Sequence, residues 1–115
     1  MALHHIGFTL RNTGGGFGFV NDSAHMPVGV SLAAGAVTHT TGNAIKVLLD
    51  QTYVQVVSVV VGPDEVMAKE GVSCGASVGL DNLVIKCFKD GVQLDPDTMT
   101  WANSNLWVIG LMSDA

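Results

Sequence analysis

The stretch Thr52–Gly62 reads Thr-Tyr-Val-Gln-Val-Val-Ser-Val-Val-Val-Gly, and it decides the fold class. Six of its eleven residues are valine and none is charged. Valine is restricted at χ1 and packs well on a pleated surface, so this stretch is the strongest strand signal in the chain. Alternation places Val57 and Val59 on one face and Val56 and Val60 on the other, so both faces are apolar. We therefore expect a strand buried on both sides, by its sheet partners and by a second sheet or a second subunit.

Shorter strand-like segments, separated by turn residues, fill the rest of the chain. They lie at residues 4–10, 17–20, 26–32, 36–40, 44–50, 76–80, 83–88, 92–94 and 106–112. Gly42-Asn43, Asp81-Asn82 and Asp90-Gly91 are hairpin or turn signals between them. Residues 66–70 fit either one helical turn or a short strand. Turn signals every ~8–12 residues predict one all-β domain over residues 1–115, of about eight to ten short strands and little or no helix. A β-sandwich, a jelly-roll-like fold and a small barrel all fit this spacing.

Composition limits the partners. Hydrophobic residues make up 48% of the chain and charged residues 13%, whereas about 25% charged residues is typical. A surface this poor in charge is expected to be partly covered in an assembly. The net charge is −5 and Arg11 is the single arginine, so nucleic-acid binding through phosphate contacts is not expected. No apolar run approaches ~20 residues, and no membrane partner is predicted. Residues 1–7 lack the basic start of a signal peptide, so we expect assembly in a cytoplasm.

The residues that could carry chemistry form no catalytic, cofactor or metal motif. The four histidines, His4, His5, His25 and His39, show no metal-ligand spacing, and each is interpreted as a surface or loop residue. Asp64 with Glu65 and Asp95 with Asp97 are close carboxylate pairs, but both pairs lie in turn-like segments beside proline. Cys74 and Cys87 fit two buried, reduced thiols better than a disulfide framework. We predict a protein that is not an enzyme and has no cofactor.

Two surfaces are candidates for binding. The first is an oligomer or partner interface on the two uncharged strands, for which the candidate residues are Tyr53, Val57, Val59, Trp107 and Ile109. Large apolar side chains of this kind dominate interfaces. The second is a glycan-binding platform near a polar loop, with Trp101, Asn103 and Asn105 as candidate contacts. Burial of both tryptophans in a core or interface is the stronger interpretation.

A small chain rich in Gly, Ala, Val, Ser, Thr and Asn, without a catalytic motif, resembles bacteriophage virion proteins. Within that group it is most similar to capsid decoration (cement) proteins. This resemblance implies a viral structural protein of the virion, assembled in the host cytoplasm as a homo-oligomer, with a trimer favoured. Its partner would be the major capsid protein, whose junctions it would bind to stabilise the head. The alternative is a tail-fibre tip or receptor-binding domain that recognises host glycan.

Overall fold

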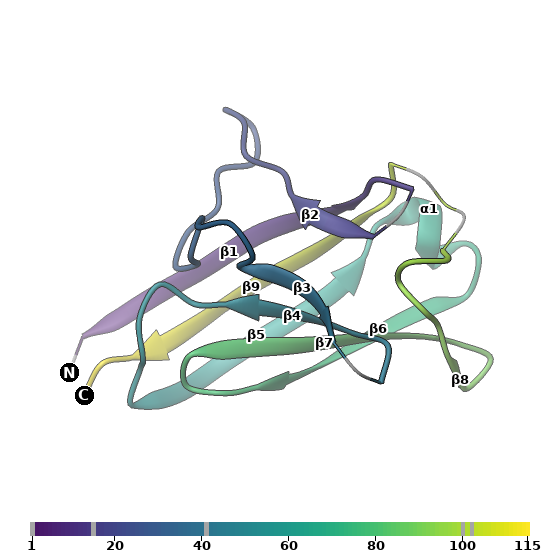
Figure 1. Ribbon diagram of the computed structural model, residues 1–115. Helices are drawn as coiled ribbons and strands as arrows, with labels where there is room; N and C mark the ends of the chain where they lie inside the picture. Colours follow the sequence, from purple (N-terminus) through teal and green to yellow (C-terminus); the bar gives the residue numbers. More distant parts are fainter. Residues whose placement is uncertain (1, 15, 41, 100, 102) are drawn as a thin grey trace.

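The computed structural model describes residues 2–14, 16–40, 42–99, 101 and 103–115. Nine strands and one short helix lie in this part of the chain (Figure 1). They are β1 (Leu3–Asn12), β2 (Phe17–Phe19), β3 (Val37–Thr40), β4 (Ala44–Leu48), β5 (Gln55–Pro63), α1 (Glu65–Ala68), β6 (Val72–Val78), β7 (Asn82–Lys89), β8 (Val92–Gln93) and β9 (Asn105–Ser113). The predicted all-β class is confirmed.

The strands form two antiparallel sheets. The first sheet has the order β2-β1-β9-β5, so the last strand of the chain lies between the first strand and the valine-rich strand. The second sheet has the order β3-β4-β7-β6, and β8 pairs with the end of β7. The two ends of the chain lie side by side, where the backbone N–H of Asp114 donates to the carbonyl of Ala2 (Figure 1).

Apolar side chains from both sheets form one core. The contributions of the first sheet include Ile6, Phe8, Leu10, Leu106, Val108 and Met112, and those of the second include Ile45, Val47, Leu83 and Ile85. Each of these strands alternates, so the residues between them point outward. Two sheets packed over a shared core correspond to the sandwich form of the predicted fold.

The valine-rich strand β5 is an edge strand, so within the single chain only one of its faces is buried, and burial of the other face by a second subunit stays a prediction. It pairs with β9, and no other described strand pairs with it. Val59 and Val61 pack against the core, whereas Val60 is 61% exposed. No described part of the chain covers the outward face of β5, so the valines on that face meet solvent.

A β-bulge at Val57 changes which face each valine occupies. Val56 lies opposite Met112 and Ser58 lies opposite Leu111, which leaves Val57 as the extra residue. Strict alternation therefore fails along β5. Val57 and Val59 were expected on one face, and the bulge places them on different faces. Next to the bulge, β5 lies close to Gly110 of β9. A Cβ atom added at Gly110 would lie 2.5 Å from the carbonyl oxygen of Ser58.

The predicted turns are largely confirmed. Asp90 and Gly91 both have positive φ and join β7 to β8 in a two-residue turn, as an Asp-Gly pair favours. The β6–β7 hairpin is closed by Gly79, whose N–H donates to the carbonyl of Asn82. Its central residues are therefore 80 and 81, one position before the predicted Asp81-Asn82 pair. The predicted strand at 26–32 is wrong, because this segment makes only isolated bridges at Val28 and Val30.

Residues 66–70 take the helical alternative, and one side chain explains why. Asp64 is the N-cap of α1, and its Oδ1 accepts a hydrogen bond from the backbone N–H of Met67. Its Oδ2 accepts from the backbone N–H of Asn105 at 2.7 Å. Asp64 therefore fixes both the start of α1 and the start of β9. Met67, fully buried, anchors the helix to the core.

Candidate functional site

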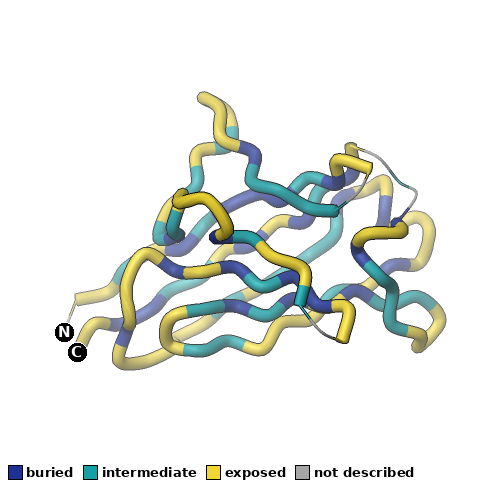
Figure 2. The backbone as a smooth tube through the Cα atoms, viewed as in Figure 1, coloured by how far each residue is buried: buried dark blue, intermediate teal, exposed yellow. Residues whose placement is uncertain are grey.

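The outer face of the first sheet carries large exposed apolar side chains. Trp107 is 52% exposed and Ile109 is 68% exposed, and both lie on the central strand β9. Buried and exposed segments alternate along the strands in Figure 2. Val60 lies directly opposite Ile109 on β5, so the two side chains are neighbours on the same face. Met26, 70% exposed, lines a shallow hollow with Trp107 and Ile109. We call Met26, Val60, Trp107 and Ile109 the outer apolar patch.

The sequence of β9 creates this patch. Its inward positions are Leu106, Val108 and Met112, all buried, and its outward positions Trp107, Ile109 and Leu111 are apolar as well. A strand of a sheet that faces water on one side normally alternates apolar with polar residues. Because β9 is apolar on both faces, its outward face resembles a surface that another molecule covers.

The patch is poor in charge and has two shallow hollows. Arg11 is the only Asp, Glu, Lys or Arg residue in β1, β5 and β9, and its Nε donates to the Oδ1 of Asn105. One hollow, of about 390 Å³, lies between Met26 and Trp107. The other, of about 300 Å³, lies beside Val60 and Ile109. These surroundings suit contact with another apolar surface.

The residues proposed for the interface from the sequence fall into three groups. Val57, Trp107 and Ile109 are exposed. Val59 is half-buried and packs against the core. Tyr53 is 2% exposed and donates its hydroxyl to Asp50, so it belongs to the monomer core and not to a free surface.

Sequence reasoning missed Val60 and Met26. Val60 was missed because the prediction placed the interface on the face of Val57 and Val59, whereas the pairing of β5 with β9 puts Val60 on the same face as Ile109. Met26 was missed because it lies in a loop outside the regular strands, and its approach to Trp107 depends on the path of that loop.

The three candidate glycan contacts have different surroundings. Trp101 is half-buried against the core, and the ammonium group of Lys89 lies 5.5 Å from the centre of its ring. Asn103 is exposed with positive φ. The side chain of Asn105 accepts a hydrogen bond from Arg11. With a cation over the ring and the core packed against it, Trp101 has little free ring surface for a sugar.

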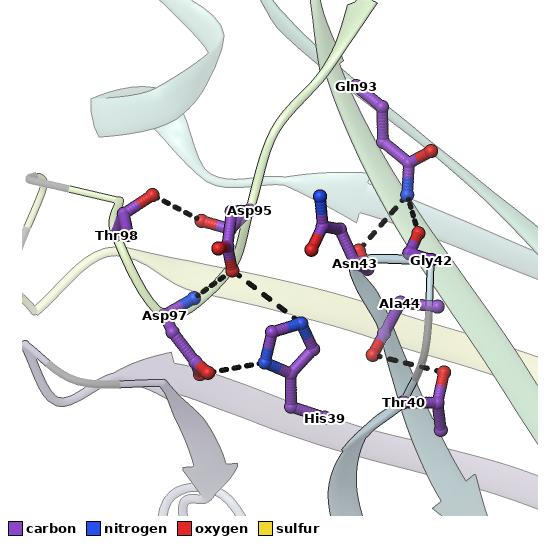
Figure 3. A network of polar contacts seen from close by, with 9 residues as sticks. All are labelled: His39, Thr40, Gly42, Asn43, Ala44, Gln93, Asp95, Asp97 and Thr98. Atoms are coloured by element: carbon purple, nitrogen blue, oxygen red, sulfur yellow. Dashed lines mark hydrogen bonds and ion pairs between the residues drawn. The ribbon is translucent and has the colours of Figure 1, made fainter.

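A second, polar cluster joins β3 to the loop before β9 (Figure 3). The Nδ1 atom of His39 contacts a carboxylate oxygen of Asp97, and its Nε2 atom lies 3.5 Å from Oδ1 of Asp95. Asp95 also accepts a hydrogen bond from the backbone N–H of Asp97, which holds the loop in shape. Sequence reasoning did not bring His39 to these carboxylates, because their separation along the chain follows no motif.

His39, Asp95 and Asp97 are the described residues that could hold a metal ion, since their ligand atoms lie within 4.8 Å of one another. The arrangement also works without a metal, because a protonated imidazole can donate to a carboxylate from each nitrogen. A metal would have to displace His39 from one of these contacts. The adjacent hollow, lined by Phe17 and Ile45 among others, is about 180 Å³, below the ~300 Å³ at which ligand pockets usually begin.

The cluster gives a prediction for the pH dependence of stability. The hydrogen bond to Asp97 raises the pKa of His39 above its ordinary value of 6.5, with the charges of Asp97 and Asp95 adding to the rise and burial opposing it. A raised folded-state pKa stabilises the fold below the unfolded pKa, and this contribution is lost as pH rises through the folded pKa. His39→Gln should therefore destabilise the protein more at pH 5.5 than at pH 9.

Urea unfolding of both proteins at the two pH values would test this. His25→Gln is a matched control, because His25 is a half-buried histidine with a single carboxylate partner, Asp22. An equal loss of stability at pH 5.5 and pH 9 for His39→Gln would contradict the prediction.

Comparison of the chain with protein-family models, curated proteins and solved structures finds no match in any of the three. Among the described residues, no helix has the length and apolar character that crossing a membrane requires. The strand order and the pairing define the class of protein as an all-β domain of two antiparallel sheets. The function is therefore proposed from this fold and from the outer apolar patch.

Proposed function

We propose that the protein is a non-enzymatic structural subunit that binds copies of itself through the outer apolar patch. The observation that carries the proposal is the exposure of Val60, Trp107 and Ile109 side by side on one sheet. Leaving such a patch in water costs roughly 25 cal/mol for each Å² of apolar surface, which covering by another subunit recovers. Tryptophan is also among the residues that contribute most to binding at interfaces.

The edge of β5 supports the same proposal. Its run of residues 55–62 contains no charged residue, and the proline at its end, Pro63, lies opposite Leu106 at the far end of the ladder. Natural edge strands are usually protected from pairing by lysine, proline or other devices. The bulge at Val57 is one such device near the start of β5. The residues after it, 58–62, carry no charge that would prevent contact with another chain. A subunit that covers the patch would also cover this edge.

We propose further that the assembly is a bacteriophage capsid decoration protein, bound as a homo-oligomer, with a trimer favoured, at junctions of the major capsid protein. The compositional resemblance, a single small β domain and the net charge of −5 support this role. A negative subunit is repelled by nucleic acid. Many copies on a lattice would make modest individual interfaces sufficient, because each bound subunit raises the effective concentration of the next contact.

The first experiment is the solution mass, measured by light scattering behind a sizing column over a wide range of concentrations. A stable trimer or other oligomer supports self-assembly. A monomer at every concentration contradicts it. Co-sedimentation with phage heads that lack their decoration protein then tests the virion role. An oligomer that does not bind such heads contradicts the decoration role, and binding of the same oligomer to a host glycan would establish the tail-fibre alternative.

A further inference from the structure

Two cysteines lie opposite each other on neighbouring strands of the second sheet. Cys74 of β6 is the direct partner of Cys87 of β7, and their Sγ atoms are 3.5 Å apart. Both are free thiols in this structure. Because directly opposite residues of an antiparallel pair point to the same face, the two side chains meet without any change in strand register.

The position of the pair in the ladder favours a covalent bond. The hydrogen bond from the N–H of Gly79 to the carbonyl of Asn82 marks a hydrogen-bonded pair at the turn. Hydrogen-bonded and non-hydrogen-bonded pairs then alternate along the strands, and Cys74 with Cys87 is the fifth pair after this one. It is therefore a non-hydrogen-bonded pair, with Cα atoms expected ~4.5 Å apart. This separation lies within the range of ~4.4–6.8 Å that disulfides span.

The two thiols differ in access to solvent. Cys87 is 3% exposed, whereas Cys74 is half-buried on an edge strand. The hydrogen bond between them lowers the pKa of Cys87 and raises the pKa of Cys74, as expected for two thiols that share one proton. An oxidant from solvent can therefore reach the pair through Cys74, with Cys87 in place behind it.

We propose that Cys74 and Cys87 form a cross-strand disulfide within one chain when the folded protein meets a small disulfide such as oxidised glutathione. In the singly deprotonated pair, Cys74 Sγ passes its proton to Cys87 Sγ as it attacks one sulfur of glutathione disulfide, which forms a mixed disulfide and releases one glutathione thiolate. Cys87 Sγ then attacks Cys74 Sγ and releases the second glutathione thiolate. The two cysteines lose two electrons and two protons in total. Glutathione disulfide takes up both and becomes two molecules of reduced glutathione.

The bond would fasten β6, an edge strand with no charged residue, to β7 inside the sheet. It would close a loop that contains the β6–β7 turn and so restrict the unfolded chain more than the folded one. In a reducing cytoplasm the thiols would stay free, and in oxidising surroundings the bond would form. This inference depends on the strand pairing and is independent of the proposed function.

The test is to incubate the folded, full-length protein with oxidised glutathione and to measure its intact mass and its free thiols. The expected result is a loss of both thiols and of two hydrogen atoms in mass, with no glutathione retained and no dimer on a non-reducing gel. A stable adduct with glutathione on the wild-type chain, a disulfide-linked dimer, or two thiols that persist would each overturn the proposal.

Two matched variants identify the order of the steps. Cys87→Ser should retain one glutathione on Cys74, because the second thiol that resolves the mixed disulfide is missing. Cys74→Ser should react far more slowly, because Cys87 is buried. Equal rates of reaction for the two variants would contradict entry through Cys74. The wild-type mass decides the central point even if a variant fails to fold.

Discussion

Replacing Gly110 with alanine should lower the free energy of unfolding by about 3 kcal/mol, at the upper end of what overpacking usually costs. The added Cβ would lie 2.5 Å from the carbonyl oxygen of Ser58, 2.8 Å from a methyl group of Val59 and 3.0 Å from the Cα atom of Val59. Two of these three atoms belong to the backbone of β5, so a change of rotamer cannot relieve the contact. Either β5 separates from β9 or the bulge at Val57 is lost. Urea unfolding followed by circular dichroism measures the change.

Gly62→Ala is the matched control. Gly62 lies in the same β5–β9 ladder, opposite Trp107, but a Cβ atom there would meet no heavy atom within 4 Å. Glycine within a strand costs roughly 0.5–1 kcal/mol relative to alanine, so this variant should be as stable as the wild type or slightly more stable. Similar losses for both variants would show that the close approach at Gly110 is not what limits its substitution.

Ile109→Glu should weaken self-association by about 30-fold or more, which corresponds to the ~2 kcal/mol of an interface hot spot. Ile109 is 68% exposed in the single chain, so the monomer should keep its stability within ~0.5 kcal/mol. In an assembly built on the outer apolar patch, the carboxylate would have to lose its water beside Val60 and Trp107 without a cationic partner. Sedimentation equilibrium of the variant and the wild type measures the dissociation constants.

Val92→Glu provides the control with the same change of charge. Val92 is 65% exposed and lies on β8, in the other sheet. It should leave the dissociation constant unchanged. If Ile109→Glu and Val92→Glu weaken association equally, added negative charge is the cause and the patch is not the interface. If Ile109→Glu associates as the wild type does, another surface joins the subunits.

The fold class could be predicted from the sequence because its signals are local. Valine-rich and alternating segments indicate strands, and the Asp90-Gly91 pair indicates a turn from its own backbone preference. The position of β5 could not be predicted in this way. Whether a valine-rich strand lies at the centre or at the edge of a sheet depends on strand order, which is a property of contacts between distant segments. Its apolar character on both faces was therefore interpreted as burial by a second sheet or a second subunit.

The candidate site was predictable to a similar degree. Trp107 and Ile109 were identified because they are large apolar residues on an uncharged strand, and local sequence is sufficient for that. Val60 required knowledge of which face of β5 is directed outward, and the cluster of His39 with Asp95 and Asp97 required the packing of the loop before β9 against β3. Tyr53 was placed on the wrong surface because an aromatic residue beside a strand has the same local signal in a core as in an interface.

The position of β9 between β1 and β5 affects how the chain reaches its native state. During synthesis on a ribosome β1 emerges early, but its main partner β9 emerges after all the other described strands, and β5 also waits for β9. The β3–β4 and β6–β7 hairpins need only nearby residues, so these two hairpins should form before the first sheet. Pulse-labelling hydrogen exchange during refolding should accordingly protect the amides of β6 and β7 before those of β1. Until β9 arrives, β5 would present its uncharged edges to other nascent chains, which makes completion of the last strand the step that ends the risk of aggregation.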